Sequence, residues 1–134
     1  MTAEIIWGNR LGSALAQAKT EGKLVLAAFF SQDCAPCSRL KNHTLGTESV
    51  REYINRHFVP VKYESGADAE QFLRFAVMAM PTILVLDADG NELFRKIGYF
   101  EPAMFIENLE QARGKGIQKL ILPIPQANEK PDLP

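Results

Sequence analysis

Cys34 and Cys37 are the residues whose type and spacing point most directly to chemistry. They are the only two cysteines of the chain and lie three positions apart, in Cys34-Ala35-Pro36-Cys37. On the first turn of a helix, this spacing places two thiols on one face, close enough to form and break a disulfide. A bridge across two intervening residues removes little entropy from the unfolded chain. The pair therefore favours redox chemistry over a structural staple.

The start of a helix, where we expect Cys34, favours the reactive form of its thiol. Unpaired backbone N–H groups and the helix dipole stabilise an anion there, and the thiolate is the nucleophile in disulfide exchange. Half-ionising an ordinary thiol of pKa about 8.5 near neutral pH needs about 2 kcal/mol, which a partly buried helix terminus can supply. We expect Cys34 to attack and a more buried Cys37 to resolve the mixed disulfide. Pro36 suits an early helical position, which needs no N–H.

Metal chemistry at the pair is the main alternative to consider. A zinc site needs four ligands, but the histidines available are only His43 and His57, whose separation is not a ligand spacing. Covalent haem would require a histidine at Ser38. We therefore expect no resident metal and no bound cofactor. A non-enzymatic binding or Cu(I)-handling module stays open as an alternative, since a lone thiol pair can bind a soft metal.

The hydrophobic pattern predicts the elements that position the pair. The continuous apolar run 24–30 is typical of a central strand buried on both faces, and it leads into the cysteines. We expect helices over 8–22, from the motif to about 44, over 48–57, over 68–76 and from 102 to 114, and further strands over 58–63, 82–86 and 92–99. This order predicts an α/β fold with a mixed sheet of four to five strands flanked by helices. A domain over 1–113 and an extended, proline-containing tail over 114–134 are expected.

Length and charge narrow the class of protein. The chain has 134 residues, which fits one domain, and a formal net charge of −1. The charge argues against a nucleic-acid or anionic-membrane partner, and no apolar run approaches the roughly 20 residues of a membrane-spanning helix. The N-terminal residues lack signal-peptide features. We expect a cytoplasmic monomer, or an exported protein if a leader was removed.

With these residues laid out, the chain resembles the thioredoxin superfamily over about 24–112. The resemblance rests on the apolar strand before the cysteine pair, on Met80-Pro81-Thr82 before another strand, and on Gly98 after the predicted hairpin. It implies a thioredoxin fold and a thiol–disulfide oxidoreductase that acts on disulfide-containing protein substrates. It also implies that a partner reductase supplies electrons through the same pair.

The resemblance further implies a substrate-binding surface around the cysteines. In the family, the proline that corresponds to Pro81 is cis and faces the pair. A cis turn would expose the backbone of Met80 to an extended substrate strand, in the manner of strand addition. Ala35, Pro36 and Gly98 belong to the same expected surface.

Three positions depart from the thioredoxin pattern or tune the pair. Asp33 replaces a tryptophan, and a carboxylate about 6 Å from Cys34 would oppose the thiolate by about 0.7 kcal/mol and could select basic or polar substrates. Ala28 replaces the buried acid that serves the resolving thiol, for which Asp33 or Glu64 could substitute through water. Lys62 falls where thioredoxin carries a lysine near that acid.

The residues between the cysteines indicate the direction of electron flow. Ala35-Pro36 is closer to the Gly-Pro of reducing thioredoxins than to the motifs of oxidising or isomerising relatives, which carry a histidine before the second cysteine. Cys37 therefore has no cationic neighbour in the motif to stabilise the dithiol. This favours a reductase over the alternatives, an oxidase or an isomerase.

Overall fold

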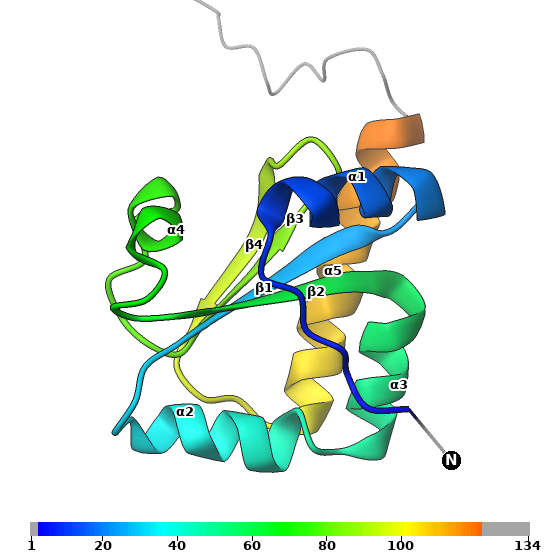
Figure 1. The fold of residues 1–134 in the computed structure, drawn as a ribbon. Helices are drawn as coiled ribbons and strands as arrows, with labels where there is room; N and C mark the ends of the chain where they lie inside the picture. The colour runs from blue at the N-terminus through cyan, green and yellow to red at the C-terminus, as the bar shows by residue number, and fades with distance from the viewer. Residues whose placement is uncertain (1–2, 122–134) are drawn as a thin grey trace, which may run out of the picture.

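One mixed four-stranded sheet forms the centre of the molecule (Figure 1). The computed structural model describes residues 3–121. Its strands are β1 (Leu24–Phe30), β2 (Phe58–Glu64), β3 (Thr82–Leu86) and β4 (Glu92–Ile97), in the order β2-β1-β3-β4. β1 pairs parallel with β2 and antiparallel with β3, which pairs antiparallel with β4. The predicted α/β class and mixed sheet are confirmed.

Helices cover both faces of this sheet. They are α1 (Leu11–Glu21), α2 (Ala35–Arg39), which continues as the π-helical segment η1 (Leu40–Thr44), α3 (Glu48–His57), α4 (Ala69–Arg74) and α5 (Pro102–Ile121). α1 and α4 pack on one face, whereas α2, η1, α3 and α5 pack on the other (Figure 1). No helix among residues 3–121 is both long and apolar enough to cross a membrane.

The position of β1 inside the sheet explains why its sequence is apolar without a break. Leu26, Ala28 and Phe30 join the core under α2, α3 and α5, while alternate residues such as Val25 and Phe29 join the core under α1 and α4. All residues from Val25 to Phe30 are fully buried. β1 is thus apolar on both sides, and its buried C-terminal end leads directly into the cysteine motif.

The first helix begins later than the sequence predicts. α1 starts at Leu11 rather than Gly8. The Gly8 N–H donates to the carbonyl of Pro60 at 3.0 Å, and its own carbonyl accepts from the Lys62 N–H at 2.9 Å. The backbone groups of Gly8 are therefore used by the outer edge of β2, where Pro60 fits because an edge strand tolerates its missing N–H.

The last helix ends later than the sequence predicts. α5 continues through Gly114 to residue 121, so the expected extended tail is wrong for residues 114–121. Gly116 is buried, and a Cβ there would lie only 3.2 Å from Cδ2 of Leu24, so a glycine allows this part of the helix to approach the sheet. Residues 122–134 lie outside the described part of the chain, and the proposed domain boundary stays a prediction.

Candidate active site

The cysteine motif begins in the short connection between β1 and α2 and continues into the first turn of α2. Asp33 has a left-handed backbone (φ 53°), which aspartate tolerates better than most residues, and it turns the chain toward the helix. Cys34 is the residue before α2 and has an extended backbone; its Sγ accepts a hydrogen bond from the Cys37 N–H at 3.2 Å. The two cysteines form a disulfide, with their Cα atoms 5.2 Å apart. The predicted placement on one helical turn is confirmed.

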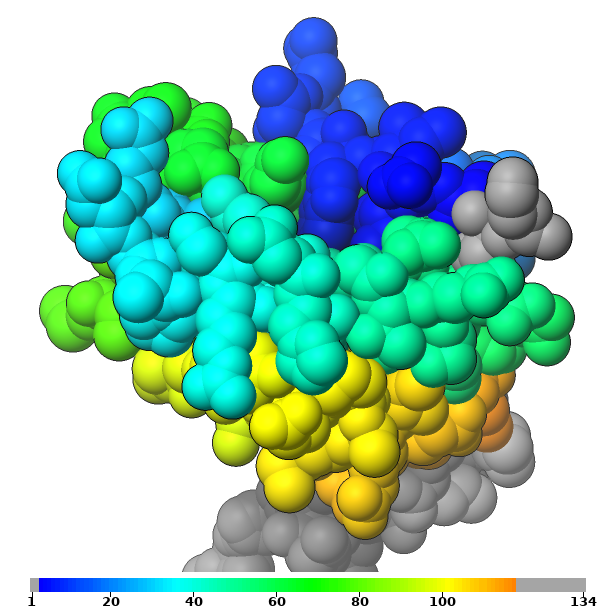
Figure 2. All heavy atoms as spheres, turned by 90° about the horizontal axis from the view of Figure 1, so that it is seen from below, coloured from blue at the N-terminus to red at the C-terminus, as the bar shows by residue number. Residues whose placement is uncertain are grey.

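The two sulfur-bearing residues differ in exposure. Cys37 is 1% exposed and belongs to the core, whereas Cys34 is partly exposed. Ala35 and Pro36, between them, are exposed. Figure 2 shows segment 31–39, in light blue to cyan, at the surface between the green residues of α4 and the yellow residues that follow β4. A macromolecular disulfide can therefore approach Cys34 but not Cys37.

The loop before β3 lies against Cys34. The Met80–Pro81 peptide bond is cis, as the resemblance implies, and the Met80 carbonyl oxygen lies 3.7 Å from Sγ of Cys34. Gly98, with φ 97°, donates its N–H to the Pro81 carbonyl at 2.8 Å. The tertiary structure thus brings together Cys34, Met80, Pro81 and Gly98, which are far apart in the sequence.

Lys62 and Glu64 each have a charged side chain with a neighbour in the structure. Lys62 pairs in register with the fully buried Ala28, and its ammonium lies 6.0 Å from the ring centroid of Trp7. The Glu64 carboxylate lies 3.8 Å from Nζ of Lys41. The roles suggested for Lys62 and Glu64 in tuning the pair stay predictions.

A polar and aromatic cluster that the sequence did not reveal joins the motif helix to the segment after β4. The Arg39 guanidinium lies 4.2 Å from the ring centroid of Tyr99. The ring of His43, four positions further along the chain, stacks on Tyr99 with the two ring centroids 6.4 Å apart. His43 Nε2 also lies 3.7 Å from Glu101. The only signal in the sequence was the position of Tyr99 directly after Gly98.

Metal-binding groups do not gather around the motif. Within residues 3–121, no three His, Cys, Asp or Glu side chains come together so that they could hold a metal ion. The site consists of a disulfide-bonded cysteine pair, the loop whose Met80 carbonyl lies beside it and an exposed helix start.

Comparison with known proteins identifies the family. A family model described as a thioredoxin-like domain matches residues 11–113. The chain belongs to this thioredoxin-like family. The match covers β1, the cysteine motif, the cis-proline loop and most of α5, so the site lies wholly within the thioredoxin-like domain.

Curated relatives resemble the thioredoxin-like domain over a small part of their own length. The thiol:disulfide interchange protein DsbD of Cronobacter sakazakii is 31% identical over 104 residues, which are 74% of this chain and 18% of that protein. DsbD of Yersinia pestis (strain Pestoides F) is 27% identical over 106 residues, 75% of this chain and again 18% of the relative. The chain therefore spans less than a fifth of the length of these relatives.

Solved structures share the fold. A thioredoxin from Thermus thermophilus superimposes with a TM-score of 0.75 and 23% identity, covering 95% of this chain and 99% of that one. The oxidised C-terminal domain of Neisseria meningitidis DsbD gives 0.66 and 22%, covering 81% and 100%. The thioredoxin fold expected from the sequence is confirmed.

Proposed function

We propose that this domain is a thiol–disulfide oxidoreductase that reduces or exchanges disulfides in protein substrates. The observation that carries the proposal is the unequal exposure of a reversible sulfur pair, with Cys34 accessible at a helix start and Cys37 buried one turn later. The likeness to proteins named thiol:disulfide interchange proteins supports it.

The reaction begins at the exposed sulfur. The Cys34 thiolate attacks one sulfur of a substrate disulfide, so a Cys34–substrate bond forms and the substrate S–S bond breaks, releasing one substrate thiolate. The Cys37 thiolate then attacks Sγ of Cys34, which forms the Cys34–Cys37 disulfide and releases the second substrate thiolate. Two electrons pass to the substrate, whose thiolates take up protons from solvent. A dithiol donor, the partner reductase, returns two electrons to the pair by the same exchange in reverse.

The protein contributes charge stabilisation and position. The Cys37 N–H that points at Sγ of Cys34 would stabilise a thiolate in the reduced form, as would the dipole of the helix that begins at Ala35. The backbone at Met80 lies beside the same sulfur, where an extended substrate segment can align. We place the substrate along this loop, with its disulfide over Cys34.

Insulin reduction by dithiothreitol tests the activity. Wild type should accelerate the reaction, and Cys34→Ser should abolish the acceleration because the attacking sulfur is gone. Cys37→Ser should instead accumulate a mixed disulfide with the substrate, which mass spectrometry detects. Equal rates for wild type and Cys34→Ser would refute the proposal.

The direction of electron transfer is a separate measurement. We propose a reductase, because Ala35-Pro36 places no cation between the cysteines that would favour the reduced pair. Equilibration with glutathione should give a potential nearer to about −270 mV than to about −120 mV. A potential near about −120 mV would indicate an oxidase.

A further inference from the structure

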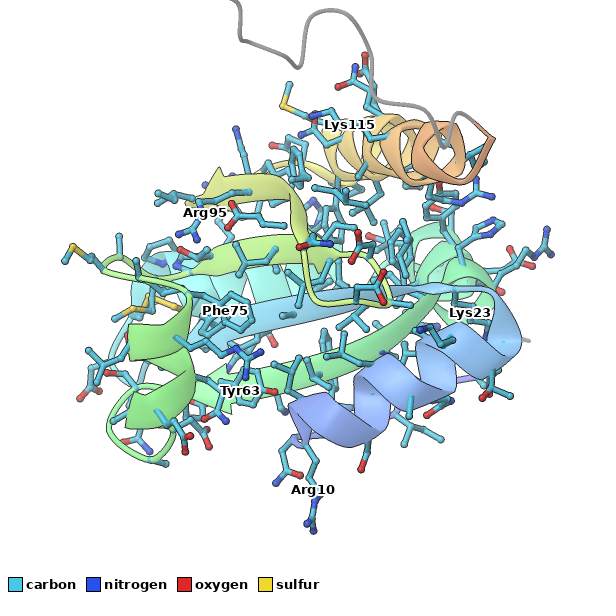
Figure 3. All side chains as sticks on the ribbon, turned by 90° about the horizontal axis from the view of Figure 1, so that it is seen from above. Arg10, Lys23, Tyr63, Phe75, Arg95 and Lys115 are labelled. Atoms are coloured by element: carbon cyan, nitrogen blue, oxygen red, sulfur yellow. A yellow bond between two sulfur atoms is a disulfide. The ribbon has the colours of Figure 1, made fainter. Side chains whose placement is uncertain are left out.

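Arg95 of β4 reaches across to the end of α4. Its Nη2 donates to the Phe75 carbonyl at 2.6 Å, and its Nη1 lies 3.5 Å from the Ala76 carbonyl oxygen. Arg95 and Phe75 are labelled in Figure 3, which shows them on the same side of the molecule. The carbonyls at a helix C-terminus lack partners within the helix, so Arg95 supplies them with donors from another element.

Glu92 holds the guanidinium in place. Arg95 Nε and Nη2 donate to the two carboxylate oxygens of Glu92 at 2.8 and 2.9 Å, a two-point contact that fixes the plane of the group. The hydrogen bond from Arg95 lowers the pKa of the Glu92 carboxyl, so Glu92 is ionised near neutral pH. The side chain of Arg95 is only 27% exposed. Its contact with Glu92 holds the planar guanidinium in the orientation that reaches the two carbonyls.

The chain that follows these carbonyls leads directly to Cys34. Residues 76–80 connect α4 to the cis proline; Ala76 has a left-handed backbone (φ 52°), and Met78 is 90% exposed. At the far end, the Thr82 hydroxyl donates to the Ala79 carbonyl at 2.6 Å, and Gly98 binds the Pro81 carbonyl. Arg95 provides the corresponding side-chain anchor at the near end, so both ends of loop 76–80 are tied to the sheet.

We propose that Arg95 is a positioning residue for protein substrates, because its clamp on Phe75 and Ala76 fixes the loop that exposes Met78 and places the Met80 backbone beside Cys34. The proposal rests on the proposed oxidoreductase function. Arg95 contacts neither cysteine, so its loss should weaken the binding of a polypeptide and leave the reactivity of the sulfur unchanged. Small disulfides, which need no extended binding surface, should be unaffected.

The experiment compares Arg95→Met with Arg113→Met. Arg113 is a matched control, since it too is 27% exposed and pairs with a glutamate three residues before it, Glu110, but on α5. Arg95→Met should raise KM for insulin about fivefold to tenfold with little change in kcat, the size expected for losing hydrogen bonds from a charged group. Its rate with 5,5′-dithiobis(2-nitrobenzoic acid) and its redox potential should equal those of wild type. Arg95→Lys should raise KM less than Arg95→Met does, since an ammonium can still donate to the Phe75 carbonyl.

Amide hydrogen exchange supplies a readout that does not depend on activity. Exchange over residues 76–80 should be faster in Arg95→Met than in wild type and unchanged in Arg113→Met. If Arg95→Met does not fold, Glu92→Gln, which weakens the hold on Arg95, should show a smaller change in the same direction. An unchanged KM for insulin in a folded Arg95 variant, or equal slowing with the small disulfide, would overturn the clamp. A wild type that reduces neither substrate would instead overturn the proposed function.

Discussion

Reactivity at Cys34 depends on which charges and dipoles its sulfur meets. The Cys37 N–H favours negative charge on the sulfur, while the exposed Asp33 carboxylate next to it in the chain opposes that charge. Helix dipoles and hydrogen bonds at a helix start are worth up to about 2 kcal/mol, more than a solvent-screened carboxylate removes. Asp33 therefore adjusts the reactivity of Cys34 without abolishing it.

Asp33→Asn tests this balance. Asparagine also tolerates the left-handed backbone at this position, so the variant removes the charge and keeps the turn. We expect about threefold more thiolate at a pH where the reduced Cys34 is mostly protonated, which corresponds to the loss of one carboxylate about 6 Å away. The rate of alkylation by iodoacetamide measures it, with Asp33→Glu as the charge-preserving control. A slower or unchanged rate would contradict this expectation.

The contact between α3 and α5 holds the layer on which the motif helix rests. The Tyr53 hydroxyl on α3 donates to Glu110 of α5 at 2.6 Å, and the buried Thr44 hydroxyl at the end of η1 donates to the Phe100 carbonyl just before α5, also at 2.6 Å. Both bonds join segments more than fifty positions apart. The motif helix is thus fixed through α5 as well as through β1.

The bond from Tyr53 gives a pH dependence that can be measured. Burial, and then the bond to Glu110, raises the pKa of Tyr53 from 10.0 to about 12. The folded protein therefore holds the proton more tightly than the unfolded chain, so this stabilisation is complete below pH 10 and disappears as the pH rises through about 12. Tyr53→Phe should lower the free energy of unfolding by about 1 kcal/mol at pH 8, a modest value because water screens the pair. The difference should shrink by pH 11 in urea unfolding.

Tyr63→Phe is the matched control. The Tyr63 hydroxyl is buried and has no hydrogen-bond partner, while its ring packs against Phe29. Removing that hydroxyl should leave the stability unchanged or raise it, by up to about 1 kcal/mol, because a buried polar group without a partner is unfavourable. If Tyr63→Phe lowered the free energy of unfolding as much as Tyr53→Phe does, the effect of Tyr53→Phe could not be assigned to its hydrogen bond.

At the scale of the whole molecule, α5 keeps contact with the sheet beyond Gly114. The part of α5 beyond Gly114 approaches Leu24 at the start of β1, and Lys115 donates to the Leu93 carbonyl of β4 at 3.3 Å. Figure 3 shows Lys115 on this part of the helix. The segment therefore covers the ends of two strands rather than leaving the domain.

Truncation measures that contribution. A chain of residues 1–113 should unfold several degrees below a chain of residues 1–121, since exposing apolar surface on Leu24 and Leu93 costs about 1–3 kcal/mol. Thermal unfolding followed by circular dichroism compares the two, and the full chain serves as the reference. Equal midpoints would mean that the domain ends at 113 in energetic terms, as the sequence alone suggested.

Local chemistry and periodicity in the sequence determined the redox pair, the buried strand before it and the alternation of strands and helices. A cysteine spacing and an apolar run are each defined by a few consecutive residues, so they could be interpreted without tertiary information. The position of Pro81 opposite Cys34 was available only through the family resemblance.

Tertiary packing decided the rest. Gly8 leaves the predicted helix because its backbone groups pair with β2, and Gly114 fails to end α5 because Gly116 lets the helix approach Leu24. The Arg95 clamp and the cluster around Tyr99 are likewise invisible in the sequence. Hydrogen bonds and close contacts between distant segments outweigh local propensities of about 1 kcal/mol per residue, and no short window of sequence records them.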